Sequence, residues 1–219
     1  MSDSDDDAPQ LSVHALAALQ EFYAEQSEKV NEEQQAMEDG QASKTGIIQE
    51  DWQLSQFWYD EQTSEVLAKE VLAAAGENGR IACVSCPTLY QKLQTMKPAS
   101  CKATVFEFDH RFATYKEDFV FYDYNKPLEL PKAIESHSYD VVVADPPFLN
   151  QECLAKTAET VKYLTKGKVI LCTGAVMETQ AKELLGASVC PFIPSHTNKL
   201  GNEFRCYANY ETQYLCHPR

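Results

Sequence analysis

The sequence lacks long apolar runs and an apolar leader. No stretch reaches the roughly 18 apolar residues that a transmembrane helix needs, and the N-terminus MSDSDDDAPQ is acidic where a signal peptide is basic and then apolar. We therefore expect a cytoplasmic protein with no membrane partner. With 219 residues, 44% of them hydrophobic, the chain is long enough for one substantial core.

Cysteine is well represented, but a second closely spaced pair is missing. Cys83 and Cys86 have the spacing of a metal or redox pair, and no further pair follows at a useful distance. A structural zinc site needs four ligands, so we expect no metal. Several of the eight cysteines lie inside apolar runs, which is typical of reduced, buried thiols.

The glycine-rich loop of dinucleotide-binding proteins is also missing. At the first turn from strand to helix the chain has Cys83-Val84-Ser85-Cys86-Pro87-Thr88 where the motif G-x-G-x-x-G would stand. A pyrophosphate needs close approach to the helix N-terminus that follows such a loop. The sequence therefore disfavours a dinucleotide, whereas a cofactor with a sulfonium or amino-acid tail has no such requirement.

Clustered positive charge is scarce. The formal net charge is −14, and residues 1–50 carry twelve acids and two lysines. We find no basic cluster beyond Lys162, Lys166 and Lys168, which spread over a predicted helix end and a turn. A net-negative chain is not attracted to phosphate backbones, so a basic protein partner is favoured over nucleic acid.

The pattern of polar and apolar residues divides the chain into three parts. Residues 1–10 predict a disordered acidic tail. Residues 11–45 begin with apolar positions at helical spacing and predict a helical extension. Residues 46–219 form the main domain, in which the aromatic segment Asp51–Tyr59 is either a lid or, as we favour, core, and a helix follows from about Asp60 to Ala75.

Strand-like and helical segments alternate after Gly79. The predicted strands are Arg80–Val84, Ala103–Phe108, Phe119–Tyr122, Tyr139–Ala144 and Lys168–Cys172. Such alternation predicts an α/β fold with a doubly wound, mainly parallel sheet. Ser188–Ile193 and Glu203–Tyr210 are joined by a polar stretch and predict a C-terminal antiparallel hairpin.

The tetrapeptide Asp145-Pro146-Pro147-Phe148 follows the predicted strand Tyr139–Ala144. The prolines remove two backbone donors and end the strand, so carbonyl oxygens stay available as acceptors. With the Asp145 carboxylate and the flat Phe148 ring, this predicts a rigid pocket for an amine. The alternative is a loop that closes the strand, with Phe148 in the core.

Acidic residues also follow the second and third predicted strands. A nucleoside ligand over such a sheet usually has its ribose hydroxyls on an acid at the end of strand two. Asp109 is the preferred candidate and Glu107 the second, while Asp123 suits a purine edge. The alternative for each is an acid in a turn. Near the hairpin, Asn202, Phe204 and Tyr207 are candidates for an acceptor wall, with core packing favoured.

These motifs together resemble the class I S-adenosylmethionine-dependent methyltransferases of the D-P-P-F type, which were formerly grouped with N6-adenine DNA methyltransferases. Three segments narrow the resemblance to the eukaryotic lysine methyltransferases of translation elongation factor 1-alpha: Gln53–Tyr59, Phe106–Phe112 and Gly201–Tyr207. The resemblance implies a Rossmann-like, seven-stranded sheet, S-adenosylmethionine as donor and a lysine acceptor in the cytoplasm. We also expect no metal and a monomer. An N6-adenine nucleic-acid methyltransferase and a non-catalytic binding scaffold remain as alternatives.

The resemblance and the motifs assign roles to individual residues. The expected catalytic residues are Asp145, Pro146, Pro147 and Phe148. The expected donor-binding residues are Phe57, Trp58, Tyr59, Ser85, Glu107, Asp109, Asp123, Tyr124 and Asp145. The expected acceptor-binding residues are Phe148, Asn202 and Phe204.

Overall fold

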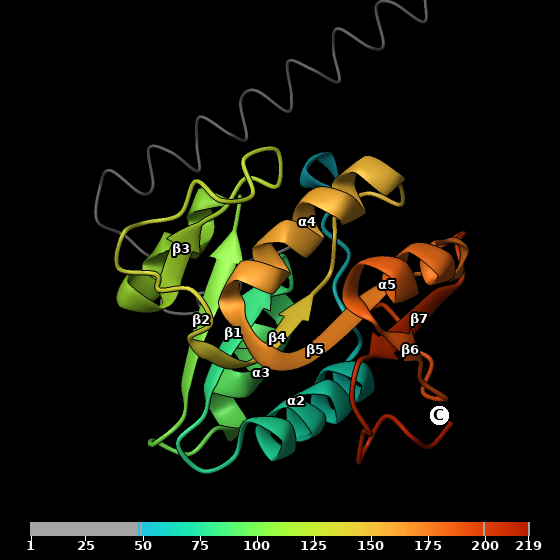
Figure 1. The fold of residues 1–219 in the computed structure, drawn as a ribbon, viewed down its shortest axis with the longest axis horizontal. Coiled ribbons are helices and arrows are strands. Elements are labelled where there is room, and N and C mark those ends of the chain that lie inside the picture. The colour runs from blue at the N-terminus through green and yellow to red at the C-terminus, as the bar shows by residue number, and fades with distance from the viewer. Residues whose placement is uncertain (1–47, 49, 199, 219) are drawn as a thin grey trace, which may run out of the picture. The chain divides into compact units, whose positions relative to one another are not determined.

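A seven-stranded sheet with the order β3-β2-β1-β4-β5-β7-β6 forms the centre of the structure (Figure 1). The computed structural model describes residues 48, 50–198 and 200–218. The strands are β1 (Arg80–Val84), β2 (Lys102–Glu107), β3 (Phe119–Phe121), β4 (Tyr139–Ala144), β5 (Thr165–Gly174), β6 (Ser188–Val189) and β7 (Phe204–Ala208). The first five pair in parallel, and β7 pairs antiparallel with β5 and β6. The predicted sheet class and hairpin are thus confirmed.

Helices cover both faces of this sheet. The α-helices are α2 (Glu61–Ala75), α3 (Pro87–Met96), α4 (Gln151–Leu164) and α5 (Glu178–Leu185), and the 3-10 helices are Trp52–Leu54, His110–Asp118 and Ala175–Met177. α2 and α3 pack on the face that carries Ile81 and Cys83, whereas α4 and α5 pack on the face that carries Ala82 and Val84 (Figure 1). The central strands β1, β4 and β5 therefore contribute alternate residues to two cores.

Local sequence explains where these elements begin. β4 contains Val141, Val142 and Val143, all fully buried, as expected for a parallel strand covered on both faces. Asp60 begins α2, because its carboxylate accepts a hydrogen bond from the Thr63 N–H. Asn150 begins α4 in the same way through the Cys153 N–H. The turn after the D-P-P-F motif is therefore held by a helix cap.

The predicted bounds agree best inside the parallel sheet. β1 and β4 match their predictions, and β5 is longer than predicted by three residues at its start and two at its end. β6 is only two residues long because Pro191 follows closely and cannot donate to a ladder. The tail at residues 1–10 and the helical extension at 11–45 lie outside the described residues.

The described residues contain no helix that is long and apolar enough to cross a bilayer. Across that same part of the chain, no group of three or more His, Cys, Asp or Glu side chains is arranged to hold a metal ion. All eight cysteines are free thiols, and seven of them are buried.

Candidate active site

The site begins where the sheet changes winding direction. From β1 the chain runs outward through β2 and β3, and it then returns to place β4 on the other side of β1. Val84 and Ala144 are in register at the ends of β1 and β4, and the Asp145 N–H donates to the Val84 carbonyl at 3.0 Å. Ser85 and Asp145 therefore start adjacent loops at the switch point, where open α/β sheets bind ligands.

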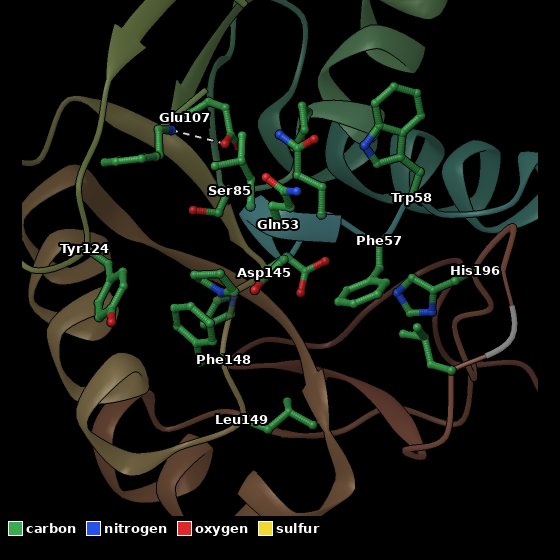
Figure 2. Close-up of a pocket in the computed structure, with 18 of the residues that line it drawn as sticks. Gln53, Phe57, Trp58, Ser85, Glu107, Tyr124, Asp145, Phe148, Leu149 and His196 are labelled. Carbon is green, nitrogen blue, oxygen red and sulfur yellow. Dashed lines mark hydrogen bonds between the residues drawn. The ribbon is translucent and has the colours of Figure 1, made fainter. Parts of the chain in front are cut away.

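A pocket of about 850 Å³ opens over these strand ends. Its floor comes from residues at or just after the ends of β1 to β4: Ser85, Glu107, Asp123 and Asp145. One wall is the segment before α2, and another is the segment that leads into β7. In Figure 2, Asp145 lies near the centre, with Phe57 and His196 to one side and Phe148 and Tyr124 to the other. The volume suits a small-molecule ligand together with part of an acceptor.

Asp145 is the central charged group of the pocket. Its carboxylate accepts a hydrogen bond from the Tyr59 hydroxyl, with the two oxygens 2.5 Å apart. Burial raises the pKa of Asp145 to about 7, and the nearby Glu107 charge adds to this, while the Tyr59 hydrogen bond opposes it. Asp145 thus titrates near neutral pH.

Glu107 is the second buried carboxyl group that lines the pocket, with 6% of its surface exposed. The backbone N–H groups of Phe108 and Asp109 donate to one of its carboxylate oxygens at 3.1 and 3.3 Å (Figure 2 marks the first of these). Burial raises its pKa to about 7, although these backbone donors counteract the rise. The Gln56 side chain also donates to this carboxylate and likewise opposes the rise in its pKa.

Asp109 does not line the pocket, so its preferred place as the ribose acid is not supported by its position. It is 5% exposed and caps the 3-10 helix that begins at His110. Its carboxylate accepts hydrogen bonds from the Gln56 amide at 2.9 Å and from the Arg111 guanidinium. Despite partial burial, which raises it, these donors hold the pKa of Asp109 below its usual range. Asp109 instead fastens the segment around Gln56 to the sheet.

Aromatic rings surround the central acid on both sides. Phe148 is 42% exposed and meets Tyr124 edge to face, with ring centroids 5.7 Å apart, so the alternative of Phe148 as core is wrong. On the other side His196 contacts Phe204, with centroids 4.8 Å apart. Phe57 is 38% exposed, which makes part of the aromatic segment a pocket wall and not core.

Comparison with known proteins identifies the family. A family model described as "Probable N6-adenine methyltransferase" matches residues 50–212. The chain is 58% identical to EEF1A lysine methyltransferase 1 from Homo sapiens, over 99% of both chains. It is 40% identical to Protein-lysine N-methyltransferase EFM5 from Saccharomyces cerevisiae, over 92% of both. The chain belongs to the EEF1A lysine methyltransferase family.

Among solved structures, the branched-chain polyamine synthase mutein from Thermus thermophilus superposes with a TM-score of 0.54. It is 12% identical, and the match covers 74% of this chain and 58% of that one. At this identity the likeness shows the fold alone. The family assignment therefore rests on the sequence relatives and the family model.

Most residues predicted for the site do meet in this pocket. Those that line it are Phe57, Trp58, Ser85, Glu107, Asp123, Tyr124, Asp145, Pro146, Pro147, Phe148, Asn202 and Phe204. Tyr59 does not line it, because the residue is buried, and only its hydroxyl reaches Asp145. Tyr207 is fully buried, as the core interpretation expects. Asp123 lines the pocket, and its carboxylate accepts a hydrogen bond from the Asn125 N–H, as an acid in a turn does.

The first loop uses an unusual backbone in place of glycine. Ser85 has a φ of 54°, in the left-handed region that glycine normally occupies. Its N–H donates to the Phe106 carbonyl at 2.8 Å, which ties the loop to β2. Pro87 follows at the first turn of α3, where its missing N–H costs nothing. The loop therefore turns sharply without the glycine fingerprint.

Sequence reasoning missed His196 and Phe108, which also line the pocket. His196 reaches it through an isolated antiparallel bridge to Tyr59, and Thr197 donates its N–H to the Trp58 carbonyl at 2.8 Å. No local pattern around His196 signals such a long-range contact. Phe108 directly follows β2 and is 50% exposed, so its place at a strand end could have marked it.

Proposed function

We propose that this chain transfers a methyl group from S-adenosylmethionine to a lysine side chain of translation elongation factor 1-alpha. The charge of the pocket carries the proposal. Among the described residues that line it, Glu107, Asp123 and Asp145 are acidic and none is Lys or Arg. Burial also lowers the pKa of His196, so this ring adds no charge at neutral pH. Such a pocket favours cations, and both a sulfonium donor and a lysine ammonium are cations.

The residues on the β1–β3 side fit the donor. When bound, S-adenosylmethionine supplies a methyl carbon that its sulfonium makes electrophilic. We assign Glu107, and not Asp109, to the ribose hydroxyls, because only Glu107 lines the pocket. Asp123 remains our candidate for the adenine edge, and the exposed Phe108 ring offers an apolar face to the base. The buried Trp58 indole N–H has no hydrogen-bond partner among the described residues and is a further donor there.

Other donor-site roles predicted from the sequence stay as proposals. They belong to Phe57, Ser85 and Tyr124, which line the same pocket, and no metal enters the proposal. Tyr59 is withdrawn from direct donor contact, because its hydroxyl is engaged with Asp145.

The D-P-P-F motif supplies the acceptor side. The lysine ammonium first loses a proton to solvent, because desolvation and the sulfonium charge lower its pKa. Asp145 and the Pro146 carbonyl then accept N–H bonds from the neutral amine and so orient its lone pair, which in-line transfer requires. Pro147 keeps the loop rigid, and the exposed Phe148 ring packs on the aliphatic lysine stem. Asn202 and Phe204 close the acceptor wall. The pKa of Asp145, about 7, means that protonation below neutral pH removes this acceptor and lowers turnover.

The description of the matching family model favours a second candidate, N6-adenine methylation of nucleic acid. A base in a duplex must be flipped out and its phosphates bound, which calls for a basic surface beside the pocket. The acidic lining opposes this candidate. A non-catalytic scaffold is the third, and it predicts no turnover with any acceptor. We place the enzyme in the cytoplasm as a monomer with a basic protein substrate.

A competition assay with labelled donor tests the proposal. Purified elongation factor 1-alpha, DNA and RNA are offered together, and mass spectrometry locates the label. We expect it on a lysine of the elongation factor. Label in nucleic acid alone would overturn the proposal, and no label anywhere would favour the scaffold.

The variant Asp145→Asn tests the role of the central acid. We expect kcat to fall by on the order of 100-fold or more while donor affinity stays within about threefold, because the neutral amide has one accepting oxygen in place of two and no charge to attract the amine. Asp118→Asn, which alters an acid bonded to Tyr90 outside the pocket, is the matched control. Near-normal turnover in Asp145→Asn would remove Asp145 from the mechanism.

A further inference from the structure

The contact between Tyr59 and Asp145 lies outside the pocket lining but reaches its central acid. Tyr59 is 4% exposed, and its hydroxyl lies 2.5 Å from Oδ2 of Asp145. The two residues are 86 positions apart, so the contact depends on the tertiary fold. The Asp60 N–H donates to the Ser195 carbonyl at 3.0 Å, and Tyr59 and His196 form an antiparallel bridge. These contacts fix the backbone of Tyr59 to the segment around His196.

Of the titratable groups described around Asp145, Tyr59 is the one that donates a hydrogen bond to its carboxylate. Glu107 faces Asp145 from β2 as a second acid and cannot favour its ionised form. His196 stacks near the Tyr59 ring, with centroids 5.3 Å apart, and burial lowers its pKa. Three buried thiols also surround the pair: Cys86 at the start of α3, Cys172 on β5 and Cys206 on β7. Burial raises the pKa of Cys86. A hydrogen bond with the Cys172 thiol raises the pKa of Cys206, so both Cys86 and Cys206 stay uncharged.

We propose that Tyr59 is a positioning residue for the methyl transfer: its hydroxyl holds Oδ2 of Asp145 so that Oδ1 is directed to the acceptor amine. This role rests on the function proposed above. A hydrogen bond to the charged form of a carboxylate favours that form. Tyr59 therefore sets both the orientation of the acceptor oxygen and the pH range in which it is ionised, without itself contacting donor or acceptor.

The chemistry of a lysine acceptor requires such control. The amine must arrive within about 3–3.5 Å of the methyl carbon with its lone pair aligned, and small errors in that geometry cost large factors in rate. An aspartate with two equivalent oxygens and a free χ2 rotation would offer several orientations. Because one oxygen is occupied by Tyr59, one defined acceptor remains for the amine N–H.

The test is a titration of the Asp145 carboxyl carbon by NMR in the wild type and in Tyr59→Phe, with kcat measured over pH 6 to 9. In Tyr59→Phe we expect the midpoint for Asp145 to rise by about one pH unit. We also expect kcat at pH 7 to fall by on the order of tenfold or more. The acid limb of the kcat profile should move to higher pH by about one unit, as the Asp145 midpoint does. Donor affinity, measured by calorimetry, should stay unchanged.

Tyr90→Phe is the matched control. Tyr90 is equally buried and donates to Asp118 at 3.0 Å, but it does not line the pocket. This variant should leave the Asp145 midpoint and the kcat profile as in the wild type. If Tyr59→Phe does not fold, 3-fluorotyrosine at position 59 keeps the hydroxyl as a stronger donor and should lower the Asp145 midpoint.

An unchanged Asp145 midpoint in Tyr59→Phe, or in the fluorotyrosine protein where that one is used, would overturn the proposal. A shifted midpoint with unchanged kcat would also overturn it, because Tyr59 would then not position the acid for transfer. If the wild type methylates no acceptor, the proposed function fails, whereas the NMR titration still decides whether Tyr59 controls Asp145.

Discussion

Two acids with raised pKa values share one pocket, and this has a cost at the residue scale. Glu107 and Asp145 both titrate at about 7, well above the usual range of carboxyl groups. A folded state that binds protons more tightly than the unfolded chain loses stability as pH rises through the folded pKa. The pocket is therefore expected to be a source of instability near neutral pH, which is a frequent property of active sites.

The variant Glu107→Gln tests this cost. The glutamine oxygen can still accept from the Phe108 and Asp109 N–H groups, but no buried charge forms. Because the stabilising protonated form of Glu107 is lost between about pH 4.5 and 7, we expect the variant to match the wild type at pH 4.5 and to exceed its unfolding free energy by about 2 kcal/mol at pH 8. Urea unfolding at both pH values measures the difference. The exposed Glu135 serves as control, since Glu135→Gln should show no such pH dependence. A constant difference in Glu107→Gln would contradict the raised pKa.

At the scale of elements, α2 holds the segment that follows β7. Glu70 of α2 is 1% exposed and accepts hydrogen bonds from the Tyr210 hydroxyl at 3.0 Å and from the Gln213 and Tyr214 N–H groups at 2.9 and 2.6 Å. Leu215, which follows, is fully buried in the core. One carboxylate thus replaces the pairing that a further strand would have provided for this backbone.

Replacing Glu70 with alanine should leave three partly buried donors without their acceptor. We expect Glu70→Ala to lower the unfolding free energy by about 3 kcal/mol. Glu65→Ala is the control on the same helix, because Glu65 pairs with Lys69 on the surface and its loss should change the unfolding free energy much less. Urea unfolding and hydrogen exchange at the Gln213 and Tyr214 amides measure the effect. Equal losses of unfolding free energy in the two variants would show that Glu70 does not anchor the segment after β7.

Elements with a strong local pattern could be predicted, whereas long-range contacts could not. The valines of β4 and the D-P-P-F turn place Asp145 correctly, because a parallel strand buried on both faces is apolar throughout. The sequence could not separate Glu107 from Asp109, since both lie at the end of β2 and only Glu107 lines the pocket, while Asp109 is held by Gln56 and Arg111. Those contacts depend on packing that the spacing of residues does not reveal.

At the scale of the whole molecule, the net charge acts on the acceptor protein, whereas the acids of the pocket act on the donor. The net charge is −14, and residues 1–50 contribute most of it. The pocket acids act on ligands within a few ångströms, whereas the summed charge acts on a basic partner before contact and is screened over about 8–10 Å at physiological salt. Salt should therefore weaken the encounter with the acceptor protein more than the binding of the donor.

Raising the salt concentration from 50 to 300 mM should lower kcat/KM for a basic protein acceptor by on the order of tenfold, because electrostatic attraction accelerates association. Donor affinity should change less than about twofold, since its contacts lie inside the pocket. A full-length variant with the acids of residues 1–47 replaced by Asn and Gln separates charge from contact, and it should show a flatter salt dependence at unchanged donor affinity. A salt dependence as steep as that of the wild type would mean that the main domain alone attracts the acceptor.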